Sequence, residues 1–449
     1  LAFQNDVPMA AKANTIGTAF LGVEMKCARC HDAPYHESKQ RDLFELAAML
    51  NQEGIKLPTS STVPAGSIPA SRKPLIEITL KAGETIEPRW PFGDLSGAAT
   101  TPVWAEVESM REKVAWKLTS PHNERFAQVM ANRVWKRLLG TGFVDPVDDW
   151  EAGKPTHPKL LGRLADHFVA TGYDLKEMVR VVMNSEAYQR ESRPEVIGQD
   201  PTFSHQIQRR MSAEQVVDSL FSISGKPLDS EELTMDKDGT QVEKNMINLG
   251  LPRRAWEFTS LSNERDRPSL AIPKAQAVVD VLENFGWRSA RAEPKSERET
   301  APNVRQSAII ANGLMGRWVT TLTEEHALTK LALRPEMTLD EFIDSVFLRI
   351  LSRLPSASER ILYAELLSEG FDSRIVPEAK RQRPKKWDQL GHVAWSNHLS
   401  AEANSIKIEM EKRAAIGDFP TVALKQTWRE NVEDMLWAML NSPEFIFVP

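Results

Sequence analysis

The sequence predicts a mainly α-helical protein, and two features of its 449 residues lead to that prediction. Apolar residues recur every three or four positions along most of the chain, as they do on the buried face of a helix. Ser or Thr followed three residues later by Glu or Gln, the capping-box pattern of helix starts, recurs beyond residue 200. A cluster of prolines between residues 54 and 102 interrupts this helical pattern, because proline removes a backbone donor.

We therefore expect three parts along the chain. Residues 1–53 form a helical segment, residues 54–102 a Pro-rich linker with a short β element, and residues 103–449 a large α-helical domain. Runs of helix-breaking residues suggest that the large domain divides near 225–250 or 288–302.

Each part has its own expected elements. In the first segment a helix flanks residues 27–31 on each side, and the second of these helices begins near Arg41. In the linker, residues 75–80 and 85–90 are expected to pair as strands around a turn. The clearest helical stripes and capping boxes of the large domain are 126–138, 160–168, 342–351, Ser212 with Gln215, Thr338 with Glu341, and Ser356 with Glu359.

The charge and the apolar runs exclude several classes of protein. The chain carries 56 Lys and Arg against 62 Asp and Glu, a net charge of −6, so it has no global positive field for a nucleic acid. Its apolar runs are far shorter than the roughly 18 residues of a membrane span. The first residues also lack the basic and apolar regions of a signal peptide. We expect no nucleic-acid partner and no membrane span in this chain.

The two cysteines are the most informative residues. They stand in the order Cys27, Ala28, Arg29, Cys30, His31, which is the CxxCH pattern of covalent haem attachment. Two thiols about one helical turn apart can each bond a vinyl group of one haem, and the adjacent histidine can bind its iron. We expect one haem c, attached through Cys27 and Cys30, with His31 as the proximal iron ligand. Because bacteria complete this attachment outside the cytoplasmic membrane, we expect a periplasmic or otherwise exported protein.

Three other readings of the cysteines stay open. A thioredoxin-like CxxC would need a βαβ context, whereas the flanking residues look helical. A zinc site needs four ligands, and only Asp32 and His36 lie nearby in the sequence. A structural disulfide across two residues is the third reading.

The sixth iron position is open as well. Met49 is one candidate, although its place on an apolar helix face also predicts simple core packing. Met9, His157 and His167 are further candidates, and an open or water-bound position is equally compatible with the sequence.

Several strings in order along the chain resemble the planctomycete-type cytochrome c proteins, in which a cytochrome c-like domain precedes a long C-terminal domain of unknown function. The strings are CARCHDAPYHESKQRDLFELAAML from Cys27, LTSPHN from Leu118, FAQVMANRVW from Phe126, THPKLL from Thr156, NSEAYQR from Asn184, RMSAE from Arg210 and WAMLNSPEF from Trp437. Relative to this family, the first half of the N-terminal domain is expected to be missing before Leu1.

The resemblance implies an exported, mostly helical haem c protein and supplies no settled reaction. Among its motif residues, Arg133, Asp149 and His157 are candidates for a site that faces the haem. Their other reading is structural, because Thr156, His157 and Pro158 form a good helix start and a buried arginine with a carboxylate often fixes packing.

Three functions follow from these observations. The first is an electron carrier with one haem c, and it implies a redox partner protein. The second is a haem-dependent enzyme that acts on a peroxide or another small substrate. The third is a binding or assembly subunit of a larger exported complex. A run of five cations within residues 380–386 reads as a solvated face, or as a docking surface for an acidic redox partner.

Overall fold

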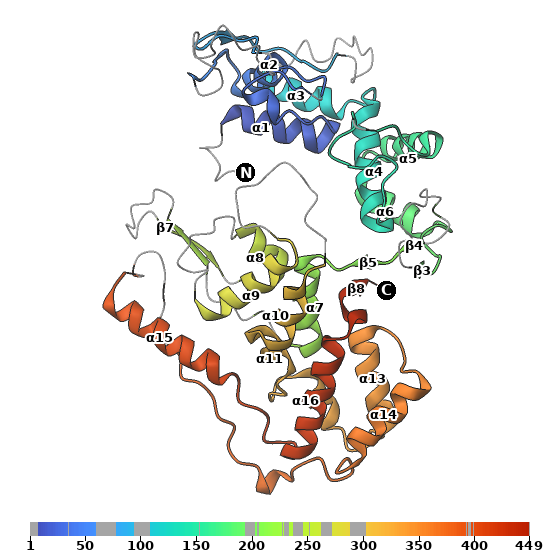
Figure 1. Ribbon diagram of the computed structural model, residues 1–449, viewed down its shortest axis with the longest axis vertical. Coiled ribbons are helices and arrows are strands. Elements are labelled where there is room, and N and C mark those ends of the chain that lie inside the picture. The colour runs from blue at the N-terminus through green and yellow to red at the C-terminus, as the bar shows by residue number, and fades with distance from the viewer. Residues whose placement is uncertain are drawn as a thin grey trace, which may run out of the picture. The chain divides into compact units, whose positions relative to one another are not determined.

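A computed structural model of the chain describes residues 8–34, 36–59, 78–93, 108–151, 153–193, 203, 206–226, 228, 233–236, 246–250, 252–261, 272–287, 302–391, 393, 397 and 399–448. Within them the fold is mainly α-helical, as predicted. The described residues up to Gln208 form one compact unit, and those from Arg209 onward form another (Figure 1). The predicted limits of the three parts stay a prediction.

The first unit is built from short helices. These are α1 (Met9–Ile16), the π-helix η1 (Gly17–Leu21), the 3-10 helix η2 (Cys27–Arg29), α2 (Gln40–Asn51), α3 (Met110–Thr119), α4 (Glu124–Leu139), α5 (Pro158–Ala170) and α6 (Leu175–Met183). Helices α1, η2 and α3 pack on α2, and α5, α6 and η1 pack on α4. The helix expected near Arg41 is therefore α2, and the stripes at 126–138 and 160–168 are the buried faces of α4 and α5.

Two apolar clusters lie in this unit. One gathers buried side chains of α1, α2 and α3 with Leu57, Leu80 and Ile86, and we call it the N-terminal cluster. The other joins α4, α5 and α6 through residues such as Trp135, Phe143 and Phe168. The segment that carries the cysteines thus has an apolar core of its own to pack against.

The expected pairing of strands in the linker is corrected by the structure. Strand β2 (Thr85–Ile86) lies within the predicted 85–90 strand, but its antiparallel partner is β1 (Ile55–Lys56), not residues 75–80. Residues 75–77 lie outside the described part, and residues 78–80 are not in a strand. The side chains of Leu57 and Ile86 are buried in the N-terminal cluster, so burial beside α2 selects the partner strand, which a local alternation of residues cannot do.

The second unit contains the remaining helices. They are α7 (Ala213–Ser224), α8 (Ala255–Leu261), α9 (Pro273–Asn284), α10 (Val304–Asn312), α11 (Leu314–Thr320), α12 (Ala327–Ala332), α13 (Leu339–Leu351), α14 (Ala357–Ser368), the 3-10 helix η8 (Glu378–Lys380), α15 (Ala401–Ile416), α16 (Gln426–Leu440) and the 3-10 helix η9 (Pro443–Ile446). Helix α11 packs against α7, α9 and α16, and one large apolar cluster runs through these elements.

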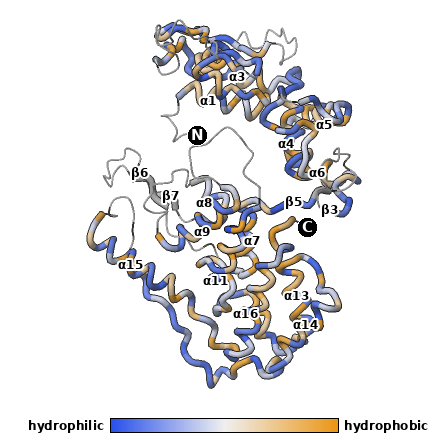
Figure 2. The backbone as a smooth tube through the Cα atoms, in the orientation of Figure 1, coloured by the Kyte–Doolittle hydropathy of each residue, from blue (hydrophilic) through white to orange (hydrophobic). Residues whose placement is uncertain are grey.

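The predicted helix starts of this unit are confirmed. Ser212, Thr338 and Ser356 cap α7, α13 and α14, and each forms a complete capping box. The stripe at 342–351 is the buried face of α13. Figure 2 shows hydrophobic residues along α16, whereas the extended segment before α15 is mostly hydrophilic.

Six further strands pair in twos. Strand β3 (Ser192–Arg193) runs parallel to β4 (Gln206–Ile207), while β5 (Arg209–Arg210) is antiparallel to β8 (Phe447–Val448) and β6 (Leu233–Asp236) to β7 (Met246–Gly250). Among the described residues, no helix has the length and apolar character needed to cross a bilayer.

Candidate functional site

The cysteines and His31 lie on a single turn of the first unit. Cys27 begins η2, and the backbone amide of Cys30 donates a hydrogen bond of 3.1 Å to the carbonyl of Cys27. Ala28, between the cysteines, is fully buried in the N-terminal cluster. Both cysteines, on either side of the buried Ala28, are free and exposed. The turn therefore presents its two sulfur atoms outward from a fixed backbone.

The imidazole of His31 is oriented by its neighbour. Its Nδ1 lies 2.8 Å from the carbonyl oxygen of Asp32, which accepts the hydrogen bond. The carboxylate of Asp32 in turn accepts from the backbone amide of Gln40 at 2.9 Å and from the hydroxyl of Thr79 at 3.2 Å. Asp32 is thus held at the start of α2, and through its carbonyl it fixes the ring of His31. With the proton on Nδ1, the lone pair of Nε2 is available to a metal.

These residues fit a haem c. An iron-binding histidine typically donates its other ring N–H to a carbonyl or carboxylate, and His31 has that arrangement. The thiols, which attachment consumes, are unpaired and accessible. Met49 lies in the N-terminal cluster with 4% of its surface exposed, a place typical of core packing.

A second group of polar side chains lies on loops of the same unit. Nε2 of His36 lies 2.8 Å from Oδ2 of Asp149 and donates to it. One ligand atom of Glu24, one of His36 and one of Asp149 all lie within 4.8 Å of one another. Burial alone would lower the pKa of His36, but the hydrogen bond with Asp149 and the charges of Asp149, Glu151 and Glu24 raise it above its usual value. We call Glu24, His36 and Asp149 the carboxylate–histidine cluster.

Neighbouring contacts fasten the loop of Asp149 to the segment of Glu24. The backbone amide of Trp150 donates to the carbonyl of Gly22 at 2.9 Å, and the amide of Glu37 donates to Glu151 at 2.8 Å. Gly22 has φ +63°, and a Cβ atom there would lie 2.2 Å from the ring of Trp150. Only glycine fits this position, because both the backbone angle and the space exclude a side chain.

The structure separates the three candidates that the sequence motifs singled out. Asp149 joins the carboxylate–histidine cluster. The guanidinium of Arg133 donates to the carbonyls of Thr18 and Ala19 and, at 2.6 Å, to Asp148, so it fastens α4 to η1. His157 precedes α5, where its ring lies 5.3 Å from that of Phe203. Arg133 and His157 thus make packing contacts here, and their place in a site that faces the haem stays a prediction.

Two residues of the cluster were not among the predicted site residues. The sequence offered His36 only as a possible ligand of a zinc site, and it gave no signal for Glu24. Their partner Asp149 is more than one hundred residues away along the chain, and no local pattern links such positions.

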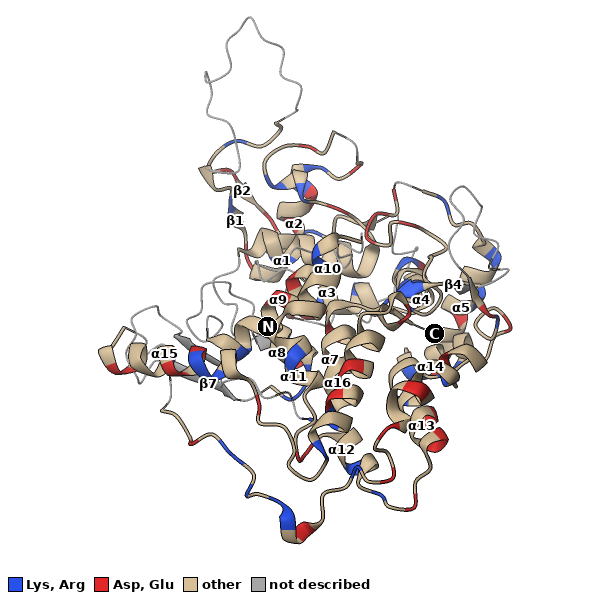
Figure 3. Cartoon of the chain, turned by 60° about the horizontal axis from the view of Figure 1, so that its bottom comes forward, with Lys and Arg blue, Asp and Glu red and all other residues tan. Residues whose placement is uncertain are grey.

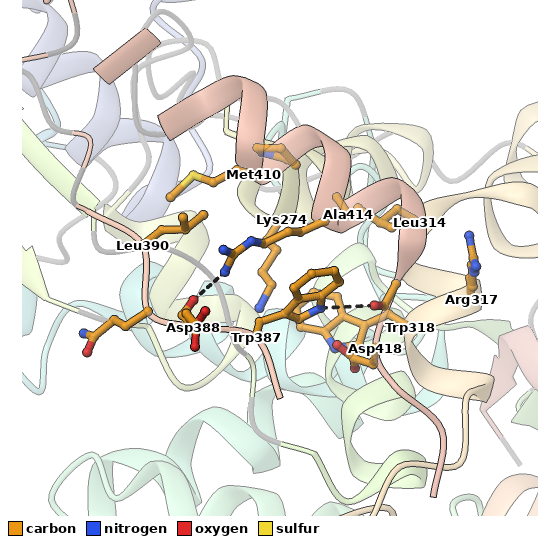
Figure 4. A pocket seen from close by; sticks show the side chains of 14 residues that line it. Lys274, Leu314, Arg317, Trp318, Trp387, Asp388, Leu390, Met410, Ala414 and Asp418 are labelled. Carbon is orange, nitrogen blue, oxygen red and sulfur yellow. Dashed lines mark hydrogen bonds between the residues drawn. The ribbon is translucent and has the colours of Figure 1, made fainter. Parts of the chain in front are cut away.

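The second unit contains a cavity of about 480 Å³ between α9, α11, α15 and the extended segment that follows η8. Figure 4 shows the rings of Trp318 and Trp387 in its wall. Nζ of Lys274 lies 5.1 Å from the ring centre of Trp318, and the indole N–H of Trp387 donates to the carbonyl of Gly417 at 3.3 Å. The cavity is therefore lined by aromatic rings with the ammonium group of Lys274 beside one of them. None of its lining residues belongs to the predicted site.

The basic run at 380–386 lies on the extended segment beside this cavity. Figure 3 shows Lys and Arg residues on the extended segment before α15, and the side chains of residues 380–386 are exposed. Exposure is compatible with both readings of this run, the solvated face and the docking surface.

Comparisons with known proteins identify two families along the chain. The model for PSCyt2, a protein of unknown function (DUF1549), matches residues 3–54, which include the CxxCH turn. The model for PSD1, a protein of unknown function (DUF1553), matches residues 110–367. Both are planctomycete-type domains, so that part of the resemblance is confirmed. No curated protein and no solved structure matches the chain. Because the PSD1 model covers more than half of the residues, the chain belongs to the PSD1 (DUF1553) family of proteins of unknown function.

Proposed function

We propose that the chain is an exported c-type cytochrome with one haem, which transfers electrons to and from a redox partner protein. Cys27 and Cys30 hold the haem covalently, and Nε2 of His31 binds its iron. The observation that carries this proposal is the hydrogen bond from Nδ1 of His31 to the carbonyl of Asp32, beside two free and exposed thiols. A bound haem c would supply a centre that gains and loses one electron.

The chain's own residues orient this group and limit its access to water. Gln40 and Thr79 hold Asp32, and Asp32 holds the ring of His31, which would be the proximal ligand of a bound haem. Loss of a hydrogen bond that orients a metal-binding histidine typically lowers metal affinity 10–100-fold. The apolar N-terminal cluster behind Ala28 lowers the local polarity, which is one way that a protein sets a reduction potential.

One observation favours a second candidate, a haem-dependent enzyme. His36, which is paired with Asp149, lies five residues after His31, and the pair is able to give or take a proton, as acid–base catalysis requires. An enzyme of this kind needs an iron position that a small substrate can reach, whereas an electron carrier works with six fixed ligands.

The test is the absorption spectrum of the full chain, made in cells that attach haem c and reduced with dithionite, before and after carbon monoxide. We expect the sharp bands of a low-spin haem that survive denaturation and do not respond to the gas. Cys27→Ala with Cys30→Ala should lose them. A second c-type cytochrome made in the same cells controls for the supply of haem.

Two outcomes would overturn the proposal in different ways. Absence of covalent haem, while the control cytochrome is loaded, would remove the haem altogether. A spectrum that shifts with carbon monoxide would indicate an accessible iron position and support the enzyme. Met49→Leu tests the sixth ligand, because it should leave the spectrum unchanged if Met49 is only a core residue and abolish the low-spin bands if Met49 binds iron.

A further inference from the structure

The carboxylate–histidine cluster combines side chains from three separate places in the first unit. Glu24 follows η1, His36 lies between η2 and α2, and Asp149 lies on the loop between α4 and α5. The cluster shares no residue with the CxxCH turn. We propose that it is a binding site for a divalent transition metal of the zinc class, distinct from the haem site.

The geometry suits such an ion. The three ligand atoms lie within 4.8 Å of one another, and two of them, Nε2 of His36 and Oδ2 of Asp149, are 2.8 Å apart. Bonds of about 2.1 Å to a tetrahedral zinc ion place ligand atoms about 3.4 Å apart. The separations of the three atoms, from 2.8 Å to at most 4.8 Å, bracket this spacing.

The chemistry of the donors selects the class of metal. One imidazole nitrogen with two carboxylate oxygens is a mixed set that suits Zn²⁺, Fe²⁺ or Mn²⁺, whereas Mg²⁺ and Ca²⁺ prefer oxygen ligands only. Three protein ligands also leave a fourth position for water, as in catalytic zinc sites. On binding, the proton on Nε2 is released to the solvent and Nδ1 carries the one remaining ring proton, so that the lone pair of Nε2 faces the metal.

Burial and anchoring set the cluster apart from an ordinary surface pair. The side chains of His36 and Asp149 are 18% and 16% exposed. The hydrogen bonds from the backbone amide of Trp150 to the carbonyl of Gly22 and from the backbone amide of Glu37 to the carboxylate of Glu151 hold both sides of the cluster in place. The site is therefore preformed, and the metal does not have to order a loop.

The test uses the full chain with Cys27→Ser and Cys30→Ser, so that neither thiols nor haem contribute to zinc binding. Equilibrium dialysis against Zn²⁺ should give one bound ion per chain, with a thermal unfolding midpoint that rises with Zn²⁺. Glu24→Gln, His36→Gln and Asp149→Asn should each weaken binding by at least about 10–100-fold, the loss typical of even an outer-shell partner. His122→Gln, which alters an exposed histidine outside the cluster, is the matched control.

Several results would overturn the proposal. Absence of zinc binding by the parent, or equal binding by His36→Gln, would leave the cluster as a hydrogen-bonded ion pair only. Displacement of Zn²⁺ by an equal concentration of Ca²⁺ would refute the class of metal. Glu24→Gln keeps the bond between His36 and Asp149, so its effect can be read even if the other two variants fold poorly. The variant with Cys27→Ser and Cys30→Ser cannot attach haem, so the result of the zinc test is independent of the proposed electron transfer.

Discussion

The capped helices of the second unit and the cysteine-bearing loops of the first are held by different kinds of contact. The capping boxes at Ser212, Thr338 and Ser356 join residues three positions apart. The loops around His31 and His36 depend on partners such as Asp149, 113 positions away. Contacts within one helical turn leave a pattern in the sequence, whereas contacts between distant loops do not. The regular framework can therefore be read from the sequence more readily than the candidate site.

The largest expected effect concerns His326, which is an exception to this contrast. It caps a helix locally, but distant charged residues also act on it. The residue is fully buried before α12, where Nδ1 accepts from the amide of Leu328 at 3.1 Å and Nε2 donates to Val319 at 3.0 Å. Burial, together with the charges of Lys226 and Arg349, lowers the pKa of His326 from 6.5 to about 4. Protonation of Nδ1 would also remove the cap, because a protonated nitrogen cannot accept.

The sign of the pH effect follows from the lowered pKa. His326 binds a proton near pH 6.5 in the unfolded chain but only near pH 4 in the folded chain. The contribution of neutral, buried His326 to the free energy of unfolding is therefore complete above pH 6.5 and is lost as the pH falls toward 4. The loss amounts to about 3 kcal/mol. Urea unfolding at pH 7 and at pH 4 should show it in the parent but not in His326→Asn, which retains a capping oxygen. Equal losses in the two proteins would contradict the prediction.

The next largest effect on stability tests a contact of the first unit that reaches beyond one helix, from α4 to the loop that follows it. The fully buried amide of Asn132 accepts from the backbone amides of Phe143 and Val144 and donates to the carbonyl of Val144, at 2.7, 3.2 and 2.8 Å. Asn132→Ala leaves these backbone groups without their partner, which should lower the free energy of unfolding by about 2 kcal/mol. Amide hydrogen exchange should also quicken across residues 143–150. Gln128→Ala, on the same helix, is the control, and an equal effect of both variants would show that Asn132 does not fix this loop.

Particular residues show how far the sequence allowed prediction. The helical class, the stripes of α4, α5 and α13 and the helix starts followed from local spacing, because each depends on neighbours within one or two turns. The partner of β2 did not, because it is chosen by burial of Leu57 and Ile86 beside α2. The CxxCH motif located the turn but not its orientation, which depends on Asp32, Gln40 and Thr79.

The same difference between local and distant contacts applies to the candidate site residues. Motif membership brought Arg133, Asp149 and His157 forward together, but a motif does not separate a packing role from a chemical one. In the structure Arg133 donates to carbonyls of η1, whereas Asp149 accepts a hydrogen bond from His36. Glu24 had no local signal at all, because it joins the cluster only when three distant segments meet.

The smallest expected effect measures what a purely local contact contributes. The hydroxyl of Ser212 accepts from the amide of Gln215 at 3.3 Å, and the side chain of Gln215 accepts from the amide of Ser212 at 2.9 Å. Ser212→Ala should lower the free energy of unfolding of the second unit by about 1 kcal/mol, and Ser212→Thr by only a few tenths, since threonine keeps the capping oxygen. Urea unfolding of both variants measures the difference. An equal loss of free energy of unfolding in Ser212→Ala and Asn132→Ala would contradict the contrast between the two units. A cap that the sequence predicts would then stabilise the protein as much as a contact that the sequence does not predict.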